Sequence, residues 1–139
     1  METNSSRSLY KYQLIYSEKL VVRRSDIHRW GVFARQRIKK YEILEEFPYF
    51  LIPTEEINQC NSCIPYSYVL DDKFSIIGMG FCGLYNHNSE SNVNFEIDKV
   101  NEVMRHYATK DINVGEELTL DYGEENTKNF ANKTKINKE

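Results

Sequence analysis

Residues 115–123 read GEELTLDYG and place a turn, a short strand and a tyrosine in direct succession. The turn is predicted at 113–116, where Gly115 can adopt backbone angles that other residues avoid. The strand is predicted over 117–122. Tyr122 puts an aromatic ring with a hydroxyl group at the end of this strand.

Short strands separated by turns are predicted along most of the chain, and helical periodicity is scarce. Val93, Phe95 and Ile97 alternate with polar residues, and a turn at 98–101 leads into 102–108, which predicts a hairpin. The whole pattern indicates a mostly β domain with little helix. The other predicted elements are strands at 19–23, 30–35 and 42–47, an apolar piece at 49–52 bounded by Pro48 and Pro53, a helical turn from Thr54, and a hairpin over 66–77 with its turn at 71–73.

The composition is typical of one soluble globular domain, because 40% of the 139 residues are hydrophobic and 28% are charged. A net charge of −3 provides no global field toward nucleic acids or anionic membranes, so we expect neither as a direct partner. Residues 1–7 are polar, which argues against a signal peptide, and no stretch approaches the roughly 20 apolar residues of a membrane span. We expect a protein of the cytoplasm or nucleus.

The three cysteines, Cys60, Cys63 and Cys82, indicate a reducing compartment and no disulfide framework. Cys60 and Cys63 have the spacing of half a zinc site, which Cys82 and His87 would have to complete. Free thiols are the favoured interpretation, so no metal is expected.

Three segments carry a family resemblance. Residues 25–34 read SDIHRWGVFA, residues 85–92 read YNHNSESN, and residues 115–123 read GEELTLDYG. In this order they resemble the GxGVFA, NHSxxPN and GEELTFDYG motifs of the SET-domain family of protein-lysine methyltransferases. The resemblance runs from about Lys19 to Glu125, and the layout is nearest to the small viral members that consist of the SET domain alone.

The resemblance implies a SET-domain, β-clip-like fold of short sheets with a C-terminal pseudoknot. It divides the chain into an N-terminal extension (1–18), the SET domain (19–125) with a variable insert region (54–77), and a C-terminal tail (126–139). It implies S-adenosylmethionine as methyl donor and a protein lysine as acceptor. The residues implied to bind the donor are the backbone of Arg29, Trp30 and Gly31, together with Asn86, His87 and Tyr122.

Gly31 and Trp30 also have a plain structural interpretation, in which Gly31 only permits a turn and Trp30 fills the core. An isolated Asn86–His87 pair is likewise most often a loop or a satisfied core histidine. The third motif favours the functional interpretation, since the family fold brings the two segments together.

Tyr122 is the predicted catalytic residue. Methyl transfer requires an uncharged lysine amine, whose pKa in water is about 10.4, aimed at the S–CH₃ bond. An aromatic channel lowers that pKa by desolvation, and a tyrosine hydroxyl can stabilise the moving methyl group by weak C–H···O contacts. No dedicated general base is evident, and none is needed if the proton leaves through water.

The substrate channel is predicted from the aromatic load of 10 tyrosines and 7 phenylalanines, although aromatic residues are also common in β-sheet cores. Tyr68 resembles a channel residue of the family and is the second predicted catalytic residue. Leu120 stands where family members carry Phe or Tyr, and an apolar residue there leaves space for di- or trimethyl-lysine. The predicted channel consists of Tyr68, Tyr85, Tyr107 and Leu120.

The sequence departs from the family pattern at three places. Arg29 replaces the first glycine of GxGVFA, which puts the affinity for the donor in doubt. Ser91 replaces a proline, and Asn88–Ser89 replace Ser-Cys. The tail lacks cysteine, so no post-SET zinc is expected. Phe130 or a second subunit would have to close the channel, which raises the expectation of a homodimer.

The leading hypothesis is an active lysine methyltransferase, with a histone H3 tail lysine as first substrate and another protein lysine as alternative. A catalytically inactive SET fold that binds peptide or donor is the second hypothesis, and Arg29 is its best support. A structural β-clip protein without a donor site is the third.

Overall fold

Two antiparallel strands, β1 (Leu20–Arg24) and β2 (Trp30–Ala34), open the fold in a computed structural model that describes residue 14 and residues 17–123. Leu20 pairs with Ala34, and both side chains are buried. The connecting turn is closed by a hydrogen bond of 2.9 Å from the Ser25 N–H to the Arg29 carbonyl. Both strands lie within one residue of the predicted bounds.

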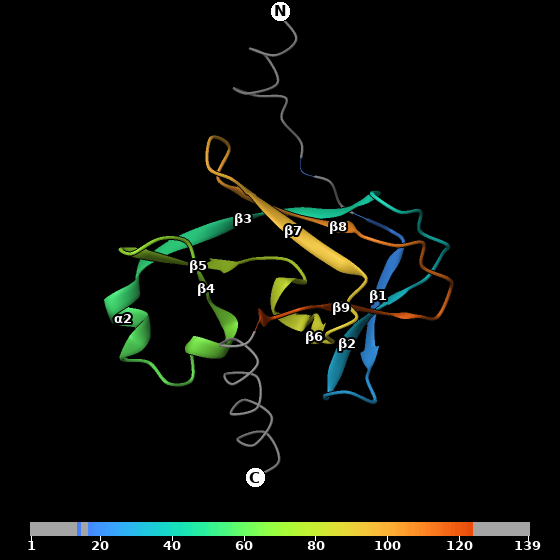
Figure 1. Ribbon diagram of the computed structural model, residues 1–139, viewed down its shortest axis with the longest axis horizontal. Coiled ribbons are helices and arrows are strands. Elements are labelled where there is room, and N and C mark those ends of the chain that lie inside the picture. Colours follow the sequence, from blue (N-terminus) through green and yellow to red (C-terminus); the bar gives the residue numbers. More distant parts are fainter. Residues whose placement is uncertain (1–13, 15–16, 124–139) are drawn as a thin grey trace, which may run out of the picture.

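The long strand β3 (Ile43–Pro53) joins the two halves of the domain. Its first half pairs with β8 (Val103–Ala108) and its second half, from Tyr49, pairs with β5 (Phe74–Gly78). Figure 1 shows β3 reaching from one strand pair to the other. The prediction of a strand that ends at Phe47 was wrong, because Pro48 lies where the pairing partner changes and its missing N–H costs little there.

The insert region begins with helix α2 (Thr54–Asn58), as predicted, and continues with the 3₁₀ helix η2 (Ile64–Tyr66). Strand β4 (Tyr68–Val69) then pairs with β5 around a turn at 71–73. The predicted hairpin is present, but it begins at Tyr68 because Tyr66 belongs to η2.

Strands β7 (Val93–Asp98) and β8 form the second predicted hairpin, with Asp98 facing Val103 next to the turn. The Asp98 carboxylate accepts hydrogen bonds from the backbone N–H groups of Val100 and Asn101, at 3.0 Å each. This is the expected chemistry of an aspartate at a turn.

The last described strand, β9 (Glu117–Leu120), lies inside the sheet and not at its edge. It pairs antiparallel with β2 and parallel with both β7 and the short β6 (Asn86–His87), which follows the 3₁₀ helix η3 (Cys82–Leu84). The sheet order is β1-β2-β9-β7-β8-β3-β5-β4, with β6 beside β9 (Figure 1). The expected mostly β fold with little helix is confirmed.

Two hydrophobic clusters fill the domain. The larger includes Leu44, Leu118 and Leu120, with Tyr122 packed against it. The smaller contains Tyr49, Ile76, Cys82 and Met104. Phe95 packs against both clusters, so they are continuous.

The cysteines differ from the prediction of free thiols. Cys60 and Cys63 form a disulfide, with their Cα atoms 5.2 Å apart, because the turn after α2 brings them together. Cys82 is a buried free thiol. Among the described residues, no group of three or more His, Cys, Asp or Glu side chains is arranged to hold a metal ion. No helix in residues 17–123 is long and apolar enough to cross a membrane.

Candidate active site

The three motif segments meet where β2, β6 and β9 lie next to one another, and Asn86 is at their centre. Its side chain is buried, and its amide nitrogen lies 3.0 Å from the Trp30 carbonyl, 3.3 Å from the His28 carbonyl and 2.7 Å from Glu117 Oε2. Ser25 Oγ donates to the other carboxylate oxygen of Glu117 at 2.7 Å. This network fixes the turn between β1 and β2 against β6 and β9.

Gly31 is required by close packing and not by a turn. It lies within β2, and a Cβ atom there would overlap Glu117 Oε2 and lie 3.1 Å from the Asn86 amide nitrogen. The interpretation of Gly31 as a turn residue was therefore wrong. Trp30 is 43% exposed, so it does not fill the core either.

Arg29 adopts a left-handed backbone conformation with φ of 35°. A side chain in this region costs roughly 1 kcal/mol or more, and glycine does not carry that cost. The position therefore keeps the backbone geometry that suits the family's glycine, although it carries an arginine.

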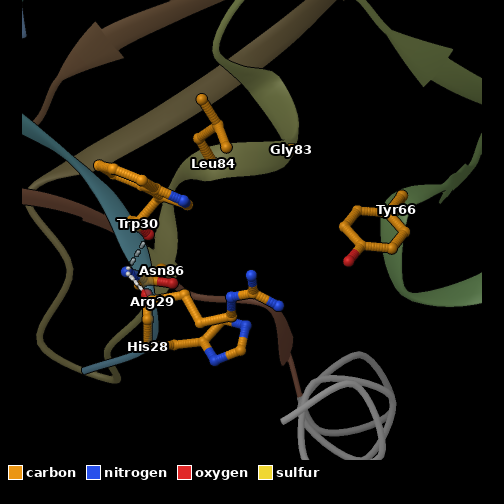
Figure 2. A pocket seen from close by; sticks show the side chains of 7 residues that line it. All are labelled: His28, Arg29, Trp30, Tyr66, Gly83, Leu84 and Asn86. Atoms are coloured by element: carbon orange, nitrogen blue, oxygen red, sulfur yellow. Dashed lines mark hydrogen bonds between the residues drawn. The ribbon is translucent and has the colours of Figure 1, made fainter. Parts of the chain in front are cut away.

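A hollow of about 160 Å³ opens beside Asn86, and we call it the donor hollow after the methyl donor that the sequence resemblance implies. Figure 2 shows Trp30 and Asn86 on one side, Tyr66 on the other, and the Arg29 guanidinium extending into the space between them. Its lining residues are His28, Arg29, Trp30, Tyr66, Gly83, Leu84 and Asn86. It thus combines an exposed indole ring, a cation and a buried amide.

A second, much narrower hollow of about 20 Å³ is the tyrosine hollow. Tyr66 and Gly83 line both hollows, so the two adjoin. The tyrosine hollow is lined by Pro65, Tyr66, Ser67, Tyr68, Cys82, Gly83 and Tyr122. Tyr68 and Tyr122, the two predicted catalytic residues, therefore lie in the same hollow.

The two tyrosine hydroxyls of this hollow are held by backbone carbonyls. The Tyr122 hydroxyl donates to the Tyr85 carbonyl, and the Tyr68 hydroxyl donates to the Cys82 carbonyl at 3.4 Å. Burial raises the pKa of both phenols above the usual value. Both therefore remain protonated at neutral pH.

His87 orients the segment that carries Tyr122. Its Nδ1 atom accepts a hydrogen bond of 3.1 Å from the Tyr122 N–H, and the two ring centroids are 5.3 Å apart. The Asp121 carboxylate lies 3.9 Å from the same nitrogen.

The other predicted channel residues lie outside both hollows. The Tyr85 ring is buried in the core, where its hydroxyl donates to Glu45 Oε2 at 3.0 Å, and only its carbonyl reaches Tyr122. Leu120 is also buried in the core next to Tyr122, and Tyr107 lies in β8 opposite Ile43 and Asn94.

Sequence reasoning missed several residues of the site. Ser25 and Glu117 stand inside the quoted motifs, but their immediate neighbours do not mark them, because Ser25 lies between Arg24 and Asp26 and Glu117 follows Glu116. Gly83 and Leu84 carried no signal either, because their position depends on how η3 packs.

A model of the SET-domain family matches residues 29–123. The chain therefore belongs to the SET-domain family. A crystal structure of a candidate histone methyltransferase from Plasmodium falciparum shares 33% sequence identity, covers 78% of this chain and 96% of its own, and superposes with a TM-score of 0.69.

Two curated relatives are histone-lysine N-methyltransferases. The H3 lysine-37 specific enzyme of Schizosaccharomyces pombe is 28% identical over 97 residues, and MEDEA of Arabidopsis thaliana is 29% identical over 123 residues. The aligned regions cover 68% and 81% of this chain, but only 66% and 18% of those proteins. A Polycomb Repressive Complex 2 structure from Chaetomium thermophilum, at 24% identity, 77% coverage of this chain and 15% of its own, shares the fold with a TM-score of 0.65.

Proposed function

We propose that this chain is an S-adenosylmethionine-dependent protein-lysine N-methyltransferase. The observation that carries the proposal is that the two hollows adjoin, with Tyr122 lining the small one and Asn86 lining the large one. Methyl transfer needs this arrangement, because donor and acceptor must meet at one point while each occupies its own site. Relatives that methylate histone lysines support the assignment.

The chemistry of the donor hollow fits S-adenosylmethionine. The exposed indole of Trp30 offers a flat apolar face for adenine, and the Arg29 guanidinium offers a cation for the donor carboxylate. Asn86 would hold the methionine part, and the backbone at Arg29–Gly31 and at His87 would complete the site. These roles, with Tyr122 beside the methyl group, are the donor contacts that we propose.

The tyrosine hollow would receive the lysine amine. The donor supplies an electrophilic methyl group on a sulfonium sulfur. Tyr68 and Tyr122 would remove water from the amine and lower its pKa, and the proton would leave to solvent before the nitrogen lone pair displaces the sulfur. The Tyr122 oxygen keeps lone pairs that can contact the methyl hydrogens. We propose Tyr122 and Tyr68 as the catalytic residues, with Tyr85 contributing its carbonyl.

We propose a histone H3 tail lysine as substrate, and accordingly a nuclear or cytoplasmic site of action. The S. pombe relative is named for H3 lysine 37, which supports the substrate class but not the position. Leu120 is buried and offers no hydrogen bond near Tyr122, so we propose that the product extends to di- or trimethyl-lysine. Mass spectrometry after exhaustive reaction tests this, and monomethyl-lysine alone would contradict it.

We propose that the SET domain occupies residues 19–125. Phe130, in the predicted tail, lies outside the described residues, as does most of the predicted extension 1–18. The tyrosine hollow could be closed by the tail of the same chain or by a second copy of the chain, and these two arrangements must be distinguished. Sedimentation velocity decides between them, because a homodimer that forms at assay concentration supports the second copy.

The experiment is a radiolabelled methyl-transfer assay with core histones and a cell lysate. We expect label on a protein lysine, and we expect Tyr122→Phe to lower the rate about 100-fold or more. Tyr41→Phe is the matched control, because Tyr41 is 68% exposed and outside both hollows. Donor binding by calorimetry without any transfer would contradict the proposed activity.

Donor binding without methyl transfer would favour an inactive SET fold that binds donor or peptide. The observation that supports this alternative is Arg29, whose guanidinium extends into the donor hollow where the family has a glycine. Arg29→Gly distinguishes the two, since a gain of donor affinity would mean that the arginine obstructs the site.

A further inference from the structure

Glu45 is a buried carboxyl group that holds both ends of a short segment. It lies in β3 with 2% exposure. Its Oε1 atom accepts a hydrogen bond of 3.0 Å from the Phe81 N–H, and its Oε2 atom accepts one of 3.0 Å from the Tyr85 hydroxyl. These two donors flank η3, so one side chain ties the whole segment 81–85 to β3.

Segment 81–85 builds parts of both hollows. Gly83 and Leu84 line the donor hollow, and Cys82 and Gly83 line the tyrosine hollow. The Tyr85 carbonyl accepts the hydrogen bond of the Tyr122 hydroxyl. A displacement of this segment would therefore move the hydroxyl that the methyl transfer uses.

The Tyr85 ring is fixed from its other side by His106, whose ring is 4.8 Å away and inclined by 23°. His106 faces Glu45 across the β3–β8 pair. The titratable groups around Glu45 are thus Tyr85 and Cys82 on the segment, Tyr68 on β4 and His106 on β8.

The burial of Glu45 is costly and is not offset by a cation. Desolvation raises the pKa of Glu45 to about 7, although the hydrogen bonds from Phe81 and Tyr85 act in the opposite direction. Glu45 forms no ion pair within residues 17–123, whereas the neighbouring Glu46 pairs with Arg105. The burial of Glu45 therefore costs stability and serves only to anchor segment 81–85. The role of that segment in both hollows best explains this cost.

We propose that Glu45 is a positioning residue that sets the location of the Tyr122 hydroxyl through segment 81–85. This inference rests on the proposed methyl transfer for its kinetic consequence, but its structural content does not. Glu45 touches neither hollow, and it acts only through Phe81 and Tyr85.

The test compares four variants in protein with ¹³C-labelled tyrosine, with the Tyr122 signal assigned by Tyr122→Phe. Glu45→Leu removes both hydrogen bonds, and Tyr85→Phe removes one. Glu45→Gln is the conservative rescue, because its amide can accept from the Phe81 N–H and donate to the Tyr85 oxygen. Glu46→Gln is the matched control, since it neutralises the adjacent buried carboxylate, which pairs with Arg105.

We expect Glu45→Leu and Tyr85→Phe to shift the Tyr122 ¹³Cζ signal and to lower kcat about tenfold. Glu45→Gln should retain the wild-type signal, and its kcat should stay within about twofold of wild type. Glu46→Gln should lower the stability of the protein and leave the Tyr122 signal and kcat unchanged. If Glu45→Leu does not fold, Tyr85→Phe decides.

A wild-type Tyr122 signal and kcat in folded Tyr85→Phe would overturn the inference, and so would equal shifts in Glu46→Gln. If the wild-type protein methylates nothing, the proposed function fails, and the Tyr122 signal alone still decides whether Glu45 positions that hydroxyl.

Discussion

Glu45 and His106 are two buried titratable residues whose pKa values shift in opposite directions, because burial disfavours the charged form of each. Burial raises the pKa of Glu45 from 4.5 to about 7 and lowers the pKa of His106 from 6.5 to about 4. Both ring nitrogens of His106 are buried without a hydrogen-bond partner among the described residues. At neutral pH the folded protein therefore keeps His106 uncharged, and each shift contributes about 3 kcal/mol to the pH dependence of unfolding.

The two contributions should nearly cancel between pH 4.5 and 6.5. Folded Glu45 retains a proton that the unfolded chain has lost, so its contribution to stability decreases as pH rises from 4.5 to 7. His106 in the unfolded chain binds a proton that the folded state excludes, so its contribution increases as pH rises from 4 to 6.5. In urea unfolding between pH 4.5 and 6.5, the free energy of unfolding of His106→Phe should therefore fall, relative to that of the wild type, as the pH rises.

Glu45→Gln should show the opposite slope in the same experiment, rising relative to wild type as pH increases. Parallel profiles for the two variants and wild type would mean that neither group is perturbed as described. His106→Phe should also be the more stable variant at pH 5, because it removes the two buried ring nitrogens that lack partners within the described part of the chain.

Arg29 illustrates a single residue that keeps a glycine-like backbone. Because its φ is 35°, Arg29→Gly should be more stable than Arg29→Ala by up to about 1 kcal/mol. Both variants lose the guanidinium, so their difference in chemical denaturation isolates the backbone contribution. Equal stability of the two would show that the turn relaxes when the side chain is removed.

At the scale of elements, β2 and β9 approach closely because Gly31 has no side chain. Gly31→Ala should displace the Glu117 carboxylate from Ser25 and Asn86 and destabilise the protein by about 1–3 kcal/mol. Glu117→Ala should then cost less in the Gly31→Ala background than in wild type, with a coupling of about 1 kcal/mol. Additive effects in thermal unfolding would contradict the described contact.

Strands β3, β7 and β8 are joined by Arg105, which contacts Glu46 at 2.5 Å, Glu96 at 2.8 Å and Asp98 at 3.5 Å. The Glu46 side chain is only 3% exposed, so Arg105→Met removes the cation that pairs with a buried carboxylate and should cost about 3 kcal/mol. Glu96→Ala is the control, because Glu96 is 59% exposed and should cost less than about 1 kcal/mol. Denaturation by urea measures both, and similar losses would contradict this ranking.

For the whole molecule, one connected sheet and two clusters that share Phe95 favour a single cooperative unfolding transition. Trp30 is the only tryptophan and lies at the donor hollow, so its fluorescence reports on that half of the domain. We expect the urea midpoints from Trp30 fluorescence and from far-ultraviolet circular dichroism to coincide. Two separate midpoints would show that the halves joined by β3 unfold independently.

Most strands were predictable because alternation and turn residues are local properties of the sequence. The β7–β8 hairpin appeared as expected from Val93, Phe95 and Ile97. The continuity of β3 through Pro48 was not predictable, since it depends on where β8 ends and β5 begins. The short β6 was likewise invisible, because its two residues become a strand only by pairing with β9.

The candidate site was predictable where a motif fixed the residue and unpredictable where packing did. Asn86, Trp30 and Tyr122 were named from motifs, and they line the hollows. Tyr85 and Tyr107 were named for their aromatic rings alone, and the direction of a ring depends on which face of its strand is buried. Glu45 was not among the predicted site residues, because its burial together with Glu46 depends on the bulge in β3.

The interior position of β9 also affects how this protein can be made. A ribosome synthesises β2, β6 and β7 first, yet each of them needs β9 as a neighbour. Until residues 117–120 have left the exit tunnel, the nascent chain carries open strand edges that can bind other chains. Maturation of the fold must therefore wait for β9, the last strand of the described residues, and a molecular chaperone that covers those edges during translation would raise the yield of native protein.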